Sequence, residues 1–247
     1  MEEGVTVRPR QERDGAWAAD VIAESVRGVG AGELPRRLCQ VATRLLPVDG
    51  AGVSLAGEGM PVPLSAGDDR AAELMEIQAS LGEGPCLEAA RTGAPVLVDD
   101  LATRAAAGRW PVFAQQATAA GVRAVYALPL GDGAGCVGTL DLYRETPGVL
   151  TAPEQHIAHL MARVVTAALM YLPSEDEYGY RADGTWLSDL ADGHDRVFQA
   201  VGMIMARLGI GADEALARLR ARAFAHGRTV LDLAHDVVAR REPFDRE

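Results

Sequence analysis

Lysine is absent from this chain of 247 residues, and all 24 basic residues are arginine. Together with the abundance of alanine and glycine, this bias is typical of G+C-rich coding and needs no functional reason. Arginine nevertheless binds phosphate in a forked geometry that lysine lacks. The basic residues are outnumbered by 35 acidic residues, which leaves a net charge of −11. Such an acidic balance argues against a protein that coats nucleic acid with its whole surface.

Long apolar runs are also missing. The longest, such as Ala124 to Leu130, fall well short of the ~18 residues that a membrane helix needs. The first residues, Met-Glu-Glu-Gly, are acidic where a secretory signal would be basic and then apolar. We therefore expect a soluble, cytoplasmic protein with no membrane partner.

Cysteine is scarce, and the pattern of metal ligands is incomplete. The three cysteines, Cys39, Cys86 and Cys136, are far apart, and no Cys-x-x-Cys pair occurs. This spacing fits neither a disulfide framework nor a zinc site. His156 and His159 could share one helix face, but no third ligand stands near them. We predict buried free thiols and no metal site.

Signatures of catalysis are absent as well. No base is placed near Cys86, and the chain has no Gly-x-Ser-x-Gly motif and no Walker A motif. The glycines from Gly131 to Gly135 join two expected strands, whereas a dinucleotide fingerprint must open a helix. We therefore predict no catalytic residues and no enzyme activity.

The first two thirds of the chain alternate between helical and strand patterns. The apolar content of 48% is typical of a globular protein. Leu34, Leu38, Val41 and Leu45 follow helical spacing and predict one buried helix face. Adjacent strand pairs between helices indicate an α+β domain built on an antiparallel sheet. The expected helices are 16–27, 33–46, 70–80, 111–120 and 151–172, and the expected strands are 51–55, 60–64, 96–98, 122–130 and 135–143.

The last quarter of the chain has a different character. An acidic segment with proline and glycine, 173–193, is the best linker candidate. Beyond it no strand pattern occurs, and stop and start signals divide the sequence into three helices. These helices are expected over 195–208, 212–226 and 229–241. We predict a polar N-terminal tail (1–15), a sensor-like domain (16–172), a linker (173–193) and an all-α three-helix bundle (194–247).

Charge divides along the same boundary. From His194 to Glu247 there are nine arginines and eight acidic residues, a net charge of +1, so the remainder carries −12. In the second of the three helices, Leu216, Leu219 and Ala223 form one apolar stripe. At 100° per residue, Arg218 and Arg222 fall opposite this stripe, and Arg220 falls at its edge. These residues form either an ordinary solvated face or a guanidinium patch for phosphates and unstacked bases.

The C-terminal region resembles the ANTAR domain of transcription antiterminators. The resemblance rests on residues 199–207 (QAVGMIMAR), the Asp213-Glu214-Ala215 triplet and the later residues Leu219, Ala223 and Ala234. Val201 stands where the family often has lysine. ANTAR proteins act on nascent transcripts, where they bind paired hairpins with short loops and prevent a terminator from forming.

The upstream region resembles a GAF domain of the actinobacterial GAF–ANTAR type. The matching segments are LGEGPCLEA (81–89), PVLVDDL (95–101), WPVFAQQA (110–117), GVRAVYALPL (121–130) and GTLDLYR (138–144). GAF domains bind small ligands or chromophores, or serve as dimerisation modules. The resemblance therefore implies a sensor domain that controls an RNA-binding output. No cofactor is identified by the sequence.

The implied partners are RNA hairpin loops in transcript leaders, a second copy of the chain in a homodimer, and a small molecule in the GAF domain. The candidate RNA-binding residues are Arg196, Gln199, Arg207, Arg218, Arg220, Arg222, His226 and Arg228. The candidate residues of a GAF ligand pocket are Cys86, Val98, Trp110, Phe113 and Tyr126. The Gly-rich segment 82–86 has two interpretations. It is either a loop that closes over a ligand in that pocket or a tight turn that caps the sheet.

Three alternatives stay open. The helical tail could bind a protein, in which case affinity would depend little on salt. The upstream domain could reduce methionine sulfoxide, as some GAF-like domains do with cysteines, although no close cysteine pair occurs in the sequence. The three helices could bind DNA, but Asp232 and Asp236 in the third helix oppose entry into a groove.

Overall fold

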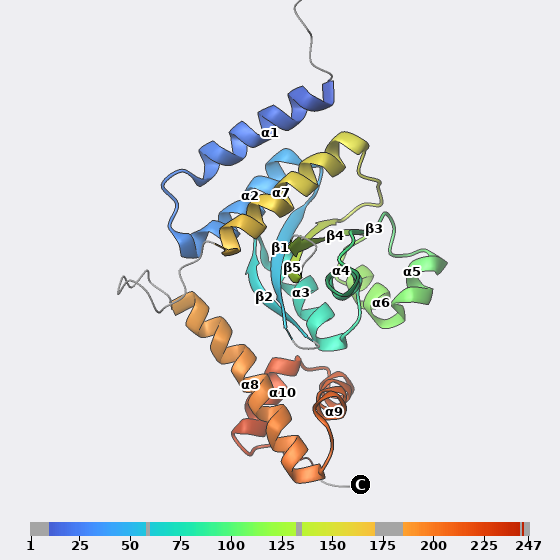
Figure 1. Ribbon diagram of the computed structural model, residues 1–247. Helices are drawn as coiled ribbons and strands as arrows, with labels where there is room; N and C mark the ends of the chain where they lie inside the picture. The colour runs from blue at the N-terminus through green and yellow to red at the C-terminus, as the bar shows by residue number, and fades with distance from the viewer. Residues whose placement is uncertain (1–9, 58–59, 132–134, 171–184, 243, 245–247) are drawn as a thin grey trace, which may run out of the picture.

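The computed structural model describes residues 10–57, 60–131, 135–170, 185–242 and 244. A sheet covered by helices on both faces is followed by a bundle of three helices (Figure 1). The α+β class and the all-α C-terminal region predicted from the sequence are confirmed. Among the described residues, no helix is long and apolar enough to cross a membrane.

The sheet has five antiparallel strands in the order β2-β1-β5-β4-β3. The long central pair, β4 and β5, forms the hairpin that the sequence predicts, and β5 also pairs with β1. The turn expected between β4 and β5 falls mostly on residues 132–134, outside the described residues. The strands are β1 (Gly50–Ala56), β2 (Pro61–Ala66), β3 (Val96–Val98), β4 (Ala124–Gly131) and β5 (Cys136–Arg144).

Each face of the sheet carries its own apolar core, because side chains alternate along each strand. In β4, Tyr126 and Leu128 face one core, whereas Val125 and Ala127 face the other. The first core is closed by α1 (Arg10–Val26), α2 (Leu34–Leu45) and α7 (Ala152–Met170) (Figure 1). The second is closed by α3 (Asp69–Leu81), α4 (Pro85–Thr92), α5 (Arg104–Arg109) and α6 (Pro111–Ala119). A short 3₁₀ turn, η1 (Ala31–Glu33), precedes α2.

Local signals in the sequence correspond to real helix caps. Thr151 N donates to Glu154 Oε2 over 2.6 Å, which is one half of a capping box at the start of α7. Thr229 Oγ1 accepts from Asp232 N over 3.0 Å and caps the last helix. Each cap satisfies a backbone donor that a helix N-terminus leaves without an intrahelical partner.

Four sequence predictions need correction. Helix α1 begins at Arg10, so residues 10–15 are helical rather than part of a frayed tail. The Gly-rich segment 82–86 is not only a turn, because α4 begins within it at Pro85, and α5 was not predicted. Helix α8 begins at Thr185 instead of 195, so the end of the predicted linker 173–193 is helical. The remainder of that linker up to residue 184 lies outside the described residues.

The C-terminal bundle consists of α8 (Thr185–Leu208), α9 (Ala212–Ala225) and α10 (Val230–Val238). The apolar stripe predicted for the second helix is confirmed, because Leu216, Leu219 and Ala223 are buried. These residues pack with Ile204 of α8 and Leu233 of α10 in one core. The bundle core also includes Met60 and Ala79 of the upstream domain. The two domains therefore share an apolar contact.

Candidate functional site

The candidate RNA-binding residues lie on α8, on α9 and on the turn that follows α9. None of them belongs to the apolar core of the bundle. Gln199, Arg207, Arg218 and His226 are exposed, and Arg196, Arg220, Arg222 and Arg228 are partly buried. His226 Nδ1 lies 2.7 Å from the carbonyl oxygen of Arg222 and so helps to end α9.

Three of the six candidate arginines, Arg218, Arg222 and Arg228, form ion pairs with acidic side chains. Arg218 contacts Glu214 one turn earlier in α9, with Nη2 2.8 Å from Oε1. Arg222 Nη2 lies 2.8 Å from Glu242 Oε1. Such exposed pairs contribute little to stability. They do, however, hold each guanidinium in place while leaving it able to exchange its partner for a phosphate.

Arg228 belongs to a second ion-pair group at the end of α10. Its Nη2 lies 2.6 Å from Asp236 Oδ2, and Arg241 Nε lies 2.8 Å from Asp236 Oδ1. Hydrogen bonds from Arg228 and Arg241 lower the pKa of the Asp236 carboxyl. Arg228 also donates to the backbone oxygen of Asp232 over 3.0 Å. It therefore ties the turn after α9 to α10.

Arg220 occupies a different place from the other arginines of α9, because it faces the upstream domain. A Cβ atom added at Gly82 would lie only 2.6 Å from Arg220 Nη1. Gly82 is the left-handed C-cap of α3, with φ of 68°. A guanidinium at this end of a helix is favoured by the helix dipole. Burial lowers the pKa of Arg220.

A second polar contact lies beside Arg220. Val230 N, at the start of α10, donates to Ser80 Oγ of α3 over 3.3 Å. Ser80 Oγ in turn donates to Glu76 Oε1 over 2.9 Å. Burial raises the pKa of Glu76, and Asp232 adds to the rise. The bundle therefore packs against the C-terminal half of α3.

The upstream domain contains a cavity of about 600 Å³ on the α4 side of the sheet. Apolar side chains, among them Leu87 and Trp110, form most of its wall, and Arg91 and the Arg109–Glu88 ion pair lie at its charged side. Its volume falls in the range of small-molecule sites. Met60 and Gly82 line the cavity and also contact the C-terminal bundle.

The structure separates the predicted ligand-pocket residues. Cys86 and Trp110 line the cavity. Val98 and Phe113 lie in the apolar core beside α6, and Tyr126 faces the core on the opposite side of the sheet. The Gly-rich segment, a candidate part of the pocket, also lines the cavity, whereas the lining residues that sequence reasoning missed come from the β1–β2 hairpin, from α4 and from β5.

The Gly-rich segment is held by two side chains that the sequence analysis did not single out. Glu83 Oε1 accepts from Val112 N over 2.8 Å and from Phe113 N over 2.7 Å, so this carboxylate caps α6. Gln78 Oε1 accepts from Cys86 N over 2.9 Å at the start of α4. The two contacts fix one wall of the cavity to α3 and α6.

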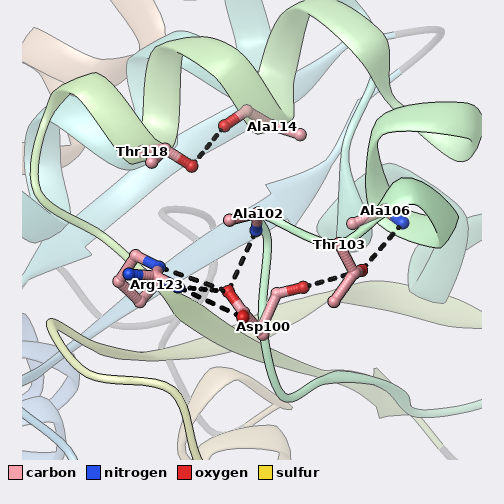
Figure 2. Close-up of polar contacts among 7 residues, drawn as sticks. All are labelled: Asp100, Ala102, Thr103, Ala106, Ala114, Thr118 and Arg123. Atoms are coloured by element: carbon pink, nitrogen blue, oxygen red, sulfur yellow. Dashed lines mark hydrogen bonds and ion pairs between the residues drawn. The ribbon is translucent and has the colours of Figure 1, made fainter.

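Trp110 and Arg109 line the cavity from the end of α5. A polar network around Asp100 positions the start of this helix (Figure 2). Asp100 accepts from Ala102 N over 3.0 Å and from Arg123 Nη2 over 3.0 Å. The hydrogen bond from Ala102, and the Arg123 guanidinium, lower the pKa of Asp100. Thr103 Oγ1 then caps α5. Arg109 stacks on Trp110, with its Cζ 4.3 Å from the ring centroid.

A buried carboxyl group, that of Asp141 in β5, lies behind the cavity. In the sequence it is recognisable as a single acidic residue within an apolar strand. Asp141 is 2% exposed and accepts from Gln78 Nε2 over 3.3 Å. Burial raises the pKa of Asp141 to about 7, against the opposing effect of Gln78. Among the described residues, Asp141 Oδ1 and Thr139 Oγ1 have no hydrogen-bond partner. Thr139 lines the cavity.

The cysteines are poor nucleophiles where they are buried. Burial raises the pKa of Cys39 to about 12, and it raises the pKa of Cys86 well above its usual value. Cys136 is partly exposed. Because the thiolate is the reactive form, the two buried thiols resist oxidation and attack on a substrate. The part of the chain that the structure describes contains no group of three or more potential metal ligands.

Comparison with known families gives two matches. The family model of the GAF domain matches residues 31–170, and that of the ANTAR domain matches residues 187–238. The chain belongs to the GAF family. It has the GAF–ANTAR architecture that the sequence analysis predicted, in which a sensor domain precedes an RNA-binding domain. GAF–ANTAR proteins are RNA-binding antitermination regulators, and both domains are regulatory rather than catalytic.

Solved structures of GAF domains resemble this chain at low sequence identity. The GAF domain of the Acinetobacter phosphoenolpyruvate-protein phosphotransferase has a TM-score of 0.49 and 10% identity, over 67% of this chain and 96% of that one. The free methionine-R-sulfoxide reductase of Neisseria meningitidis has a TM-score of 0.46 and 13% identity, over 67% and 93%. The A. Aeolicus nlh2 GAF domain has a TM-score of 0.47 and 13% identity, over 65% and 98%. No curated protein matches the chain.

Proposed function

We propose that this GAF–ANTAR protein binds hairpin loops of transcript leaders through α8 and α9, and that a ligand in the GAF cavity controls this binding. The RNA-binding part is supported by Arg218 and Arg222 of α9, which have exchangeable acidic partners. The control part is supported by one observation above all. Met60 and Gly82 form part of the cavity wall and at the same time contact the ANTAR bundle.

The physical route of control follows from this shared wall. A ligand that pushes on Gly82 moves the C-cap of α3, on which Arg220 lies. A ligand that contacts Met60 moves a side chain of the bundle core. The ligand shifts the equilibrium only by its difference in affinity between the docked and undocked arrangements. Undocking would expose Arg220 and the start of α10.

A homodimer fits the target. Two adjacent hairpins present two similar loops, and a two-fold dimer would engage both, which gains avidity without any new contact. We propose that α7 and α8 set the spacing of the two ANTAR domains. Sedimentation of the full chain with and without a two-hairpin RNA would measure the stoichiometry, and a complex of two chains per RNA is expected.

The test of the proposed function is a titration of the full chain with a labelled RNA that carries two short-loop hairpins. A duplex DNA of equal length is the control, and each titration is run at two salt concentrations. Selective, salt-sensitive binding to RNA is expected. Arg220→Ala should increase the affinity for RNA, because it releases the bundle from the upstream domain. If Arg220→Ala and Arg218→Ala weakened RNA binding equally, Arg220 would contact the RNA itself.

A protein-binding output is the second candidate, and a groove between α8 and α9 favours it. The groove has a volume of about 400 Å³ and is lined mainly by apolar residues, among them Phe198, Met205 and Leu216. Phe198 is 38% exposed. Binding through this groove would change little with salt, whereas phosphate contacts weaken steeply.

A further inference from the structure

The chain continues past the end of the ANTAR match and folds back onto α9. The match ends at residue 238, and α10 ends at Val238. Arg240 then adopts a left-handed conformation with φ of 57°, which turns the chain away from the helix axis. The backbone nitrogens of Arg241 and Glu242 both donate to the carbonyl oxygen of Asp236, over 2.8 and 3.3 Å.

This turn delivers two side chains to the guanidinium of Arg222. Glu242 Oε1 lies 2.8 Å from Arg222 Nη2. The ring of Phe244 lies under the guanidinium, with its centroid 4.7 Å from Arg222 Cζ. Phe244 is only 6% exposed and packs into the bundle core, whereas the Glu242 side chain is 24% exposed. The ring is thus a fixed platform, and the carboxylate is a partner that can leave.

The arrangement has the chemistry of an occupied phosphate site. A guanidinium held over an aromatic ring has fewer orientations open to its forked donors. The same fork accepts a carboxylate or a phosphate, because both offer two oxygens at similar spacing. Arg222 Nε is buried and has no hydrogen-bond partner among the described residues, so the pair with Glu242 leaves one donor of the guanidinium unmet. A backbone phosphate offers the fork two charged oxygens, as the carboxylate of Glu242 does.

We propose that Arg222 and Phe244 form a subsite for a backbone phosphate of the target RNA, and that Glu242 occupies this subsite until RNA displaces it. The inference rests on the proposed function, because it names one contact of the RNA-binding face. It adds a role for the segment after residue 238, which would preorganise Arg222 through Phe244 and compete with RNA through Glu242.

An internal competitor has a measurable signature in the salt dependence of binding. In the present chain, an RNA phosphate replaces an existing ion pair of Arg222. After removal of Glu242, the same phosphate contact forms on a guanidinium without an acidic partner. The plot of log affinity against log salt should then become steeper by about 0.7 for a single-stranded loop, because binding now forms one net ion pair where the wild type only exchanges one for another.

The experiment compares the RNA affinity of the wild type and four full-length variants. Glu242→Gln removes the carboxylate but keeps the length of the side chain, and it should bind RNA about 3- to 10-fold more tightly at moderate salt. Asp213→Asn is the matched control, because it removes one exposed charge from the far end of α9. It should change affinity by less than about 2-fold. Arg222→Gln in the Glu242→Gln background should abolish the gain.

A fourth variant tests the platform. Phe244→Leu keeps an apolar group in the bundle core but removes the ring, and it should weaken RNA binding about 2- to 5-fold. Circular dichroism checks that it remains folded. Equal affinities and equal salt slopes for Glu242→Gln and Asp213→Asn would overturn the inference and leave the proposed function intact. If none of the proteins bound RNA, the proposed function would fail, and this inference would fail with it.

Discussion

Asp141 gives the sharpest stability prediction, because the folded and unfolded chains bind a proton at its carboxyl with different affinity. Burial raises its pKa from 3.8 to about 7 in the folded chain. Between these two values the folded state binds more protons than the unfolded state, so the free energy of unfolding falls as pH rises through this window. Above pH 7 the free energy of unfolding that is lost by ionising Asp141 no longer changes with pH. At about 1.4 kcal/mol for each pKa unit, this loss is on the order of 4 kcal/mol.

Substitution of Asp141 by asparagine removes this titration. The neutral amide keeps an oxygen that can accept from Gln78 Nε2, which now donates to Asp141 over 3.3 Å. We expect Asp141→Asn to match the wild type within about 1 kcal/mol at pH 4, and to exceed it by about 2 to 4 kcal/mol at pH 8. The gain should grow between pH 4 and about pH 7 and then level off.

The assay is urea unfolding of the full chain at several pH values, followed by tryptophan fluorescence, to which the buried Trp110 contributes. Asp20→Asn, which removes an exposed carboxylate from α1, is the control and should show no such dependence on pH. If Asp141→Asn differed from the wild type by the same amount at pH 4 and pH 8, the reasoning from burial would be refuted. A loss of stability at pH 8 would refute it as well.

Three further predictions concern the contacts around the cavity and the bundle. Glu83→Ala should lower the free energy of unfolding by about 1 to 2 kcal/mol, because α6 loses its cap; thermal unfolding measures this loss. Arg220→Ala should speed hydrogen exchange at the C-terminal end of α3, whereas Arg218→Ala should not. Equal exchange rates in both variants would contradict the packing of the bundle against α3 through Arg220. With Ellman's reagent at pH 8, Cys136 should react first and the other two thiols only on unfolding, so a fast reaction of two thiols would count against their burial.

Periodicity and caps predicted most of the fold because these signals are local. The apolar stripe of α2 and the Thr151–Glu154 cap of α7 each depend on residues within a few turns. Helix α4 was missed for the opposite reason. It is short and follows two glycines, and its start depends on the Gln78 side chain from α3. A single-sequence pattern does not contain that contact.

The candidate site was predicted in part for the same reason. A helical wheel places Arg218 and Arg222 away from the core, and the structure agrees. It does not reveal that a segment some 20 residues later returns to Arg222, or that Arg220 faces another domain. Similarly, Cys86 and Trp110 line the cavity, but the other walls come from strands and loops that only the tertiary fold brings together.

The wall shared by the cavity and the bundle has a thermodynamic consequence for the sensor itself. If a ligand that contacts Met60 and Gly82 changes the affinity of the chain for RNA, then RNA must change the affinity of the cavity for that ligand by the same factor. The transcript then acts as an effector of the GAF domain. A cell that makes more of the target leader would thereby alter how much ligand is needed to produce a response.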